Sequence, residues 1–385
     1  MEIELKPRIR FKGFTEVWEQ RKYSEIGQNL SGGSLSYDSL DENGKYKCVL
    51  YGDLYTLYDS IIFDIPRRTN TKGNTIFKND ILFPQSTTVD AYSLISPACL
   101  NDETAETSGC FVIRPNKDID GNFVAYYTKG NEKQRFKLST KAQGLTIVHL
   151  YYQSIKDETL FIPKLEEQKI ISDLFIKLDS LITLHQRKYE KLQNVKKGLL
   201  EKMFPADCKN IPEIRFKGFT EVWEQRKFDE VAIYRNGKAH ENSIDENGKY
   251  IVVNSKFVST NGEVIKYSNN QIEPLYKNEI AFVLSDVPNG RAIARTYLVE
   301  TDDKYTLNQR IAGITPSKET NSYFLHILMN RNKYFLAFDD GAKQTNLSVK
   351  DVMGFETFYP SFNEQTKIGE LFKNLDSLIT LHQRE

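Results

Sequence analysis

Several polar loops combine arginine or lysine with asparagine, glutamine, serine or threonine and contain few carboxylates. The segment 67–74 is RRTNTKGN, without an acidic residue, and the segment 129–141, KGNEKQRFKLSTK, has five basic residues and one glutamate. Arginine forms bidentate hydrogen bonds with guanine, asparagine and glutamine form them with adenine, and lysine, serine and threonine bind phosphate oxygens. These loops predict contacts with DNA, although each loop alone is also typical of a solvated surface.

Loops of the same character recur in the second half of the chain, for example RNGKAH at 235–240 and KQTN at 343–346. Their presence in both halves strengthens the case for nucleic acid. The residues that we predict to bind DNA are Arg67, Arg68, Lys72, Lys129, Lys133, Arg135, Lys141, Arg235, Lys238, Arg291, Arg310, Lys343 and Gln344.

Catalytic motifs are absent from the sequence. It contains no Pro-Pro pair, so it lacks the N/D-P-P-Y/F loop that holds a flipped adenine, and it has no glycine-rich phosphate loop or H-E-x-x-H segment. Carboxylate pairs such as Asp102-Glu103 and Asp302-Asp303 lie in loop-like sequence and are expected to be solvated. The 52 basic and 52 acidic residues cancel, so any positive charge must be confined to one face. We expect a non-catalytic protein without a cofactor or metal of its own.

The cysteines and the apolar segments indicate a cellular compartment. Cys48, Cys99, Cys110 and Cys208 are scattered without C-x-x-C spacing, which favours free thiols over a zinc site or a disulfide framework. No run of about 18 apolar residues is present, and the first residues, MEIELKPRIRF, contain no apolar signal region. We therefore expect a cytoplasmic protein.

Two segments of the chain occur twice. The segment 7–22, PRIRFKGFTEVWEQRK, matches 212–227 at fifteen of sixteen positions, and LDSLITLHQR is identical at 178–187 and 375–384. The offsets differ, 205 residues for the first repeat and 197 for the second, so the stretch between the repeated segments is shorter in the second copy. The pattern indicates an internal duplication in which the repeated segments, here called the frames, were kept, while the stretches between them, here called the interiors, diverged. This is typical of exchangeable recognition modules, with simple decay after duplication as the alternative.

The second repeat belongs to long amphipathic helices. Apolar residues at alternating steps of three and four predict a helix from about 165 to 204, roughly 60 Å long, that ends at Pro205. The predicted seam contains Ile171, Leu174, Leu178, Leu181, His185, Lys188, Leu192, Val195 and Leu199. The shorter second copy begins near Ser361 and uses Ile368, Leu371, Leu375, Leu378 and His382. We expect the two helices to pair antiparallel, and the sequence leaves open whether the second is naturally short or truncated.

The interiors have the pattern of α+β domains. Short apolar runs such as YKCVLYG (46–52) and IAFVL (280–284) alternate with turn signals, and a helix is predicted around 322–338. His185 and His382 occupy equivalent seam positions, which favours a polar residue that sets the register of the helix pair over a pH switch or metal ligands.

The order of these segments resembles one known family. An opening F-K-G-F-x-x-x-W segment (11–18 and 216–223), a variable interior, and a closing P-x-x-x-E-Q segment that leads into a long helix (163–168 and 360–365) occur twice. Residues 178–204 and 341–352 are similar to that family's central helix and to the stretch before its second helix. Over nearly its whole length the chain resembles the specificity subunit of Type I restriction-modification enzymes.

The resemblance implies an α+β fold with a pseudo-two-fold internal repeat. Two target-recognition domains of mixed α/β structure (1–160 and 207–358) would be separated by two long antiparallel coiled-coil helices (161–206 and 359–385). Each domain would recognise one half of a bipartite asymmetric DNA site, the first through Arg68, Lys72, Lys133 and Arg135, and the second through Arg235, Lys238, Arg291, Arg310 and Gln344.

The resemblance also implies partners. Two modification subunits that carry S-adenosylmethionine would dock on the helices and methylate adenine, and ATP-dependent restriction subunits would join them for cleavage. The alternative from another class is a non-catalytic protein–protein adaptor with duplicated interaction modules. An adaptor of zero net charge would not need its basic residues gathered on one face. Retention on DNA or heparin separates the two hypotheses.

Overall fold

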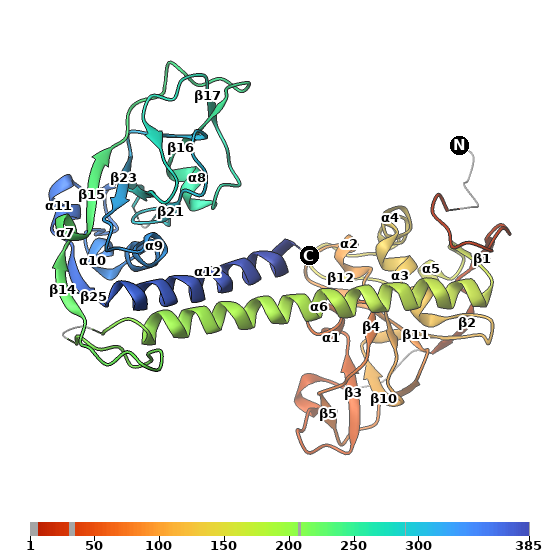
Figure 1. Cartoon of the computed structure of the whole chain (residues 1–385). Helices are drawn as coiled ribbons and strands as arrows, with labels where there is room; N and C mark the ends of the chain where they lie inside the picture. Colours follow the sequence, from red (N-terminus) through yellow and green to blue (C-terminus); the bar gives the residue numbers. More distant parts are fainter. Residues whose placement is uncertain (1–6, 31–34, 207–208, 289, 385) are drawn as a thin grey trace. The chain divides into compact units, whose positions relative to one another are not determined.

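The computed structural model of the chain describes residues 7–30, 35–206, 209–288 and 290–384 (Figure 1). Residues 1–6 of the first predicted domain and Cys208 lie outside the described residues. The chain divides into two compact units, unit 1 at 1–183 and unit 2 at 184–385. Helix α6 (Leu165–Lys202) begins in unit 1 and ends in unit 2. Cys48, Cys99 and Cys110 are buried free thiols, as expected from their spacing.

Unit 1 contains two main sheets. One has the strand order β2-β11-β7-β9-β4, and the other has the order β5-β3-β10-β6. The bounds in the first sheet are β2 (Gly27–Leu30), β11 (Cys110–Pro115), β7 (Ile81–Pro84), β9 (Ala98–Leu100) and β4 (Ile61–Ile62). The bounds in the second are β5 (Arg68–Thr69), β3 (Tyr46–Leu50), β10 (Thr104–Ser108) and β6 (Asn74–Phe77).

Unit 2 repeats this topology with different residues. Its sheets have the orders β15-β23-β19-β21 and β17-β16-β22-β18. The bounds in the first are β15 (Ala232–Asn236), β23 (Ile311–Pro316), β19 (Ile280–Val283) and β21 (Thr296–Leu298). The bounds in the second are β17 (Tyr267–Ser268), β16 (Tyr250–Val253), β22 (Tyr305–Leu307) and β18 (Pro274–Leu275). The described part of unit 2 has no counterpart of β4.

The central strands β7 and β19 are buried on both faces. In β7, Ile81 and Phe83 belong to one apolar cluster and Leu82 belongs to another. Strand β19 alternates in the same way between two clusters. Because successive side chains of a strand point to opposite faces, such a strand needs apolar residues at every position, and ILF and IAFV supply them.

Four short pairings and the helices complete the units. Strand β1 (Glu19–Lys22) pairs with β13 (Thr159–Ile162), β8 (Ser86–Thr87) with β12 (Val148–His149), β14 (Glu224–Lys227) with β25 (Glu356–Tyr359), and β20 (Ser285–Asp286) with β24 (Thr345–Asn346).

The helices of unit 1 before α6 are α1 (Asp53–Thr56), α2 (Ala91–Leu94), α3 (Gly121–Gly130), α4 (Glu132–Ser139) and α5 (Tyr152–Ile155), with a 3-10 turn at Tyr37–Ser39. Those of unit 2 after α6 are α7 (Phe228–Val231), α8 (Ser255–Ser259), α9 (Ser322–Met329), α10 (Lys333–Leu336), α11 (Val349–Met353) and α12 (Phe362–Arg384).

The helical segment predicted around 322–338 is present, and it is divided into two helices, α9 and α10. Arg331, between α9 and α10, has a φ of 56°, in the left-handed region that an α-helix does not contain. The Asn332 side chain then caps α10 by accepting a hydrogen bond from the Tyr334 amide.

The repeated frame segments close each unit on itself. In unit 1 the Arg10 guanidinium forms two hydrogen bonds, of 2.6 and 2.7 Å, with Glu167, and in unit 2 Arg215 forms two of 2.7 Å with Glu364. Both carboxylates are 1% exposed. A bidentate arginine–carboxylate pair satisfies a buried charge well, which explains why the opening and closing segments are repeated together.

The glutamine next to each buried glutamate fixes a helix of its unit. Gln168 Oε1 accepts from the Asp120 amide (2.9 Å) at the start of α3, and its Nε2 donates to the Pro163 carbonyl (2.8 Å). Gln365 makes the same bonds in unit 2, from the Asn321 amide (3.0 Å) and to the Pro360 carbonyl (3.0 Å). The E-Q pair in the repeat thus has a structural role at both places.

Within unit 2 the end of α6 packs along α12, as Figure 1 shows. Leu192, Leu199 and Phe204 of the α6 segment contact the cluster that contains Ile368 and Phe372 of α12. Lys196 forms an ion pair with Asp376. Lys196 lies opposite Asp376, and Phe204, further along the chain, lies opposite the earlier residue Phe372. The two helices therefore run in opposite directions, and the expected antiparallel pairing is confirmed.

The predicted seam is wrong at alternate positions. In α12 the buried apolar residues are Ile368, Phe372, Leu375 and Ile379. The seam is therefore correct at Ile368 and Leu375, whereas Leu378 is 45% exposed and Leu371 only partly buried. In α6, Val195 and Lys188 are exposed, and their neighbours Lys196 and Tyr189 are partly buried. Leu174, Leu178 and Leu181 are also exposed, at 42%, 42% and 51%. Apolar residues occupy both candidate columns of α12, so the pattern did not distinguish them, and packing of Phe372 near Phe204 did.

The two seam histidines meet inside unit 2. Their Nδ1 atoms, in His185 and His382, are 3.1 Å apart. Among the described residues no cluster of three or more His, Cys, Asp or Glu side chains is arranged to hold a metal ion. Adjacent polar seam residues are consistent with a register-setting role.

Candidate nucleic-acid interface

In unit 2, three predicted DNA-binding loops meet at the short segment 284–286. The Leu284 amide donates to the carbonyl of Arg310 (3.1 Å), and Gln344 Nε2 donates to Ser285 Oγ (2.8 Å). The Asp286 carboxylate accepts from the amide of Ala292 (2.6 Å), the residue after Arg291. The fold therefore brings together the loops that carry Arg291, Arg310 and Gln344.

An arginine cluster adjoins this segment. Arg295 Nε donates to the carbonyl of Arg291 (2.6 Å), and Arg331 Nη1 donates to the carbonyl of Ile293 (3.3 Å). Burial lowers the pKa of Arg295, and repulsion from Arg331 and Arg291 lowers it further. No described carboxylate forms an ion pair with any of the three. Such a concentration of unneutralised charge attracts phosphate groups.

Sequence reasoning identified Arg291 and missed Arg295 and Arg331. Arg295 follows Arg291 by four residues in RAIAR, a repeat that could have been noticed. Arg331 lies between two asparagines in a segment predicted to be helical, so only the fold brings it to the cluster.

The other predicted residues of unit 2 differ in whether a carboxylate of the same unit already pairs with them. Arg235 on β15 forms hydrogen bonds of 2.5 and 2.7 Å with Glu279, which is 5% exposed. Lys238 pairs with Glu273 at 2.9 Å. The side chains of Arg310 and Lys343 are exposed and form no ion pair with a described residue. Arg235 is therefore held by the domain, whereas the latter two are available to a ligand.

The equivalent edge of unit 1 is built from the same backbone contacts. The Gln85 amide donates to the Gly109 carbonyl (3.0 Å) and the Leu150 amide donates to the Gln85 carbonyl (3.0 Å), as Leu284 and Leu347 do in unit 2. Strands β8 and β12 form this edge, as β20 and β24 do in unit 2.

The unit 1 edge borders an aromatic cleft of about 880 Å³ instead of an arginine cluster. Among its lining residues are Tyr37, Tyr51, Tyr55, Tyr58, Lys129, Arg135 and His149. Tyr55 lies on the short helix α1, and Tyr51 and Tyr58 lie just before and just after it, so one short segment supplies all three tyrosines. Sequence reasoning missed these tyrosines, although their spacing in YGDLYTLY was visible.

Two of the predicted residues of unit 1, Lys129 and Arg135, line this cleft, and Arg67 lies against one of its tyrosines. Arg67 lies 5.4 Å from the ring centre of Tyr37 and is paired with Asp53 (2.7 Å). Arg135 lies 4.2 Å from the ring centre of Tyr92, and Lys129 is paired with Asp59.

The remaining predicted residues of unit 1 are not gathered at the cleft. Arg68 donates to the Gly44 carbonyl (3.2 Å), and Lys72 lies 5.6 Å from the ring centre of Tyr46, so both belong to the β3–β5 side. On and after α4, Lys133 is exposed and Lys141 pairs with Glu158 at 2.7 Å. Hydrogen bonding from Lys141 and Lys137 lowers the pKa of Glu158 against the effect of burial.

Comparison with known proteins defines the class of this two-unit fold. The family model described as the Type I restriction modification DNA specificity domain matches residues 15–194 and again residues 220–385. The chain belongs to this family. In Type I systems the specificity subunit is the non-catalytic component, which agrees with the absence of catalytic motifs from the sequence.

Two relatives come from Methanocaldococcus jannaschii. The Type I restriction enzyme MjaVIII specificity subunit is 26% identical over 286 residues, which cover 70% of this chain and 67% of the relative. The putative Type I restriction enzyme MjaX specificity subunit is 22% identical over 391 residues, which cover 96% of this chain and 89% of the relative.

Solved structures show the same fold. The Type I restriction-modification S subunit from M. genitalium matches with a TM-score of 0.64 and 16% identity, over 98% of this chain and 94% of that chain. A chain from a structure on complex assembly and conformational transition of the Type I R-M system matches with a TM-score of 0.50 and 13% identity, over 98% of this chain and 94% of that chain. In the described part of this chain, no helix is long and apolar enough to cross a membrane.

Proposed function

We propose that the chain directs a Type I restriction-modification complex to a bipartite, asymmetric DNA site, with one half recognised by each α+β domain. The observation that carries the proposal is the repeated edge with unlike chemistry. The β8–β12 edge borders a tyrosine-lined cleft, and the β20–β24 edge adjoins three arginines. Domains of one topology with different edges suit two different half-sites.

The second half-site is served by unneutralised cations. We place Arg291, Arg295 and Arg331 on phosphates or guanine, with Arg310 and Gln344 on the adjoining loops. The first half-site is served by Arg135, the tyrosines of the cleft and Lys129, with Lys133, Arg68 and Lys72 as further phosphate contacts. Lys129 is retained because its partner, Asp59, is exposed, unlike the carboxylates held by the four residues that follow. Arg67, Lys141, Arg235 and Lys238 hold carboxylates of their own unit, so we assign them a positioning role at the interface.

The long helices serve as spacer and docking element in this proposal. We divide the chain into recognition domains at 1–160 and 207–358 and helical segments at 161–206 and 359–385. Leu174, Leu178 and Leu181 of α6 are exposed and apolar, which suits contacts with two modification subunits. Those subunits would supply S-adenosylmethionine, restriction subunits would supply ATP-driven cleavage, and the complex would act on DNA in the cytoplasm.

The decisive experiment is a map of methylated adenines in cells with and without the gene. We expect one bipartite motif to lose methylation when the gene is deleted. The double variant R295A/R331A should weaken methylation at that motif, whereas the matched control R226A, an arginine paired with the exposed Glu224, should not. An unchanged methylation map after deletion would refute the proposal and favour the adaptor hypothesis.

A binding assay locates the effect. The complex of the chain with modification subunits should bind the duplex with a salt dependence set by its phosphate contacts, and R295A/R331A should reduce the slope of log K against log salt by roughly one to two. An adaptor would not be retained on DNA under any of these conditions.

A further inference from the structure

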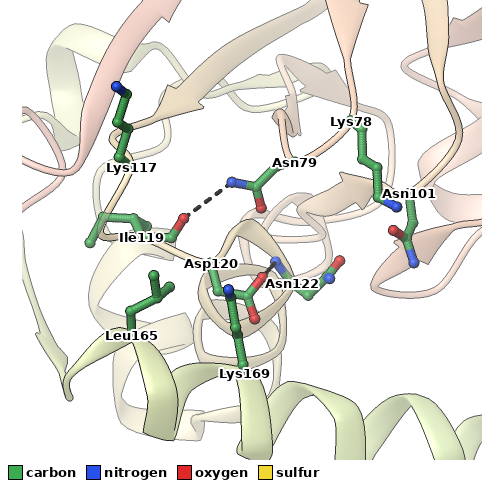
Figure 2. Close-up of a pocket in the computed structure, with 9 residues that line it drawn as sticks. All are labelled: Lys78, Asn79, Asn101, Lys117, Ile119, Asp120, Asn122, Leu165 and Lys169. Atoms are coloured by element: carbon green, nitrogen blue, oxygen red, sulfur yellow. Dashed lines mark hydrogen bonds between the residues drawn. The ribbon is translucent and has the colours of Figure 1, made fainter.

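A pocket of about 430 Å³ in unit 1 is separate from the cleft described above. Its lining includes Lys78, from the turn between β6 and β7, and Lys169, from the second turn of α6. Figure 2 shows the end of Lys78 beside Asn101 and the end of Lys169 beside Asp120, with Asn122 between them, whereas the ammonium group of Lys117 is directed away from this space. Pockets of this volume are large enough for small polar ligands.

The charges around the pocket are predominantly positive. None of Lys78, Lys117 and Lys169 forms an ion pair or side-chain hydrogen bond with a described residue. The one carboxylate in the lining, Asp120, already accepts from Ser172 Oγ (2.5 Å) and from the Asn122 amide (3.2 Å). Three lysines against one occupied carboxylate leave a net positive site, so an anion bound there is favoured.

The asparagine side chains in the pocket indicate a ligand that has a hydrogen-bond donor as well as a negative charge. Asn122 Oδ1 is buried and has no hydrogen-bond partner among the described residues. A buried acceptor without a donor costs free energy, which a ligand hydroxyl or amine would recover. The Asn101 side chain also makes no hydrogen bond within the described structure. A ligand with anionic oxygens and a hydrogen-bond donor satisfies both kinds of group.

Unit 2 offers an internal comparison at the equivalent place. The amides of Asn79 and Asn278 donate to the carbonyls of Leu100 and Val299, each at 2.8 Å, which aligns the two turns. Lys78 then corresponds to Lys277 and Lys117 to Lys318. In contrast, Asn101, Asn122 and Lys169 are replaced by Glu300, Tyr323 and Thr366.

These replacements remove the features that make the unit 1 pocket attractive to an anion. Glu300 contributes a negative charge, Thr366 removes a lysine, and the Tyr323 hydroxyl donates to Asp376 (2.7 Å). The basic pocket is therefore not a property of the shared frame.

We propose that the pocket formed by Lys78, Lys117, Lys169, Asn101 and Asn122 binds a phosphate group attached to a sugar, either in a nucleic-acid backbone or in a free nucleotide. Lys78 and Lys169 contact the phosphate oxygens of either ligand. In a free nucleotide a sugar hydroxyl also donates a hydrogen bond to Asn122 Oδ1, whereas a DNA backbone supplies the phosphate oxygens alone. The site is additional to the two recognition edges and does not depend on which bases they contact.

Pyrophosphate binding to the full chain tests the site. Isothermal titration calorimetry at constant ionic strength should detect binding to the wild-type chain, and K78Q or K169Q should each weaken it roughly tenfold, the loss expected for one hydrogen bond between charged groups. The matched control K277Q, at the equivalent turn of unit 2, should bind as the wild type does. Circular dichroism verifies that the variants are folded.

A second measurement distinguishes the two sources of phosphate. In the complex with modification subunits, K78Q/K169Q should lower the salt slope of DNA binding by about one if the phosphate belongs to the backbone, and should leave it unchanged if the ligand is a free nucleotide. The proposal is overturned if the double variant changes neither pyrophosphate affinity nor the salt slope. A wild-type complex that fails to bind DNA would refute the DNA-targeting proposal alone, because the pyrophosphate titration still decides the pocket.

Discussion

The substitution R235A separates two roles that one arginine can have. As a base contact, Arg235 would be dispensable for folding and its loss would relax the DNA specificity at one position. The structure instead places its guanidinium on Glu279, with hydrogen bonds of 2.5 and 2.7 Å, and on the Pro274 carbonyl at 2.6 Å. Burial alone would raise the pKa of Glu279, but hydrogen bonds from Arg235 and Thr315 outweigh it and lower this pKa.

The expected magnitude follows from what remains after the substitution. Glu279 would stay buried at 5% exposure with the Thr315 hydroxyl (2.5 Å) and the Tyr276 amide (2.8 Å) as partners, but without a counter-charge. Removal of one partner of a buried pair costs about 3–5 kcal/mol. Because 26% of the Arg235 side chain is exposed and solvent screens it, we expect the lower end, about 3 kcal/mol.

The assay uses the single tryptophan of each unit. In a W18F background, Trp223 fluorescence reports urea unfolding of unit 2, and R235A should lower its unfolding free energy by about 3 kcal/mol. R226A, which removes an exposed pair with Glu224, should change it by less than about 1 kcal/mol. Wild-type stability of R235A together with lost discrimination at one base pair would refute this reasoning.

The equivalent position in unit 1 suggests a variant that should restore part of the stability lost in R235A. There the acid at the position of Glu279 is Asp80, and it is paired with Arg114 (2.7 Å), which lies at the place of Thr315 in the equivalent strand. The double variant R235L/T315R transplants this arrangement into unit 2. It should recover part of the stability that R235A loses.

Three further predictions concern the frame and the helix pair of unit 2. Q365A removes the hydrogen bonds to the Asn321 amide and the Pro360 carbonyl and should destabilise unit 2 by about 2 kcal/mol in urea, with a T366A variant as control. F372A should cost about 3–5 kcal/mol, whereas L378A, at the column favoured by the sequence, should cost less than about 1 kcal/mol, and the reverse order would restore the predicted seam. Burial lowers the pKa of His326 from 6.5 to about 4, so the unfolded state binds the proton more tightly and stability is lost as pH falls below about 6.5. At pH 5 this group should lower the unfolding free energy by about 2 kcal/mol relative to pH 7, and H326A should lack the difference.

The duplicated frame, the long helices and the α+β class were predictable because each depends on a pattern that extends over many residues. Fifteen of sixteen matched positions and a seam of alternating threes and fours leave few other arrangements. The choice between Leu378 and Ile379 was not predictable in this way. Neighbouring apolar residues satisfy the same periodicity, and contacts distant in sequence decide which is buried.

The candidate interface was predictable in composition more than in detail. Arg291, Arg310 and Gln344 were chosen for their residue types, and the fold brings their loops together at 284–286. Arg235 was chosen on the same grounds, yet it pairs with a carboxylate 44 residues away. A basic residue in a polar loop does not reveal its partner, because that partner is set by strand pairing across the sheet.

Each unit is fastened by side chains that lie outside its variable interior. Arg10 with Glu167, and Arg215 with Glu364, join the residues just before the interior to those just after it. If recombination within these near-identical flanks exchanged an interior, the arginine and the glutamate of the closing pair would both be retained. Specificity could then change in a single genetic event, while the surfaces that assemble the complex stay as they were.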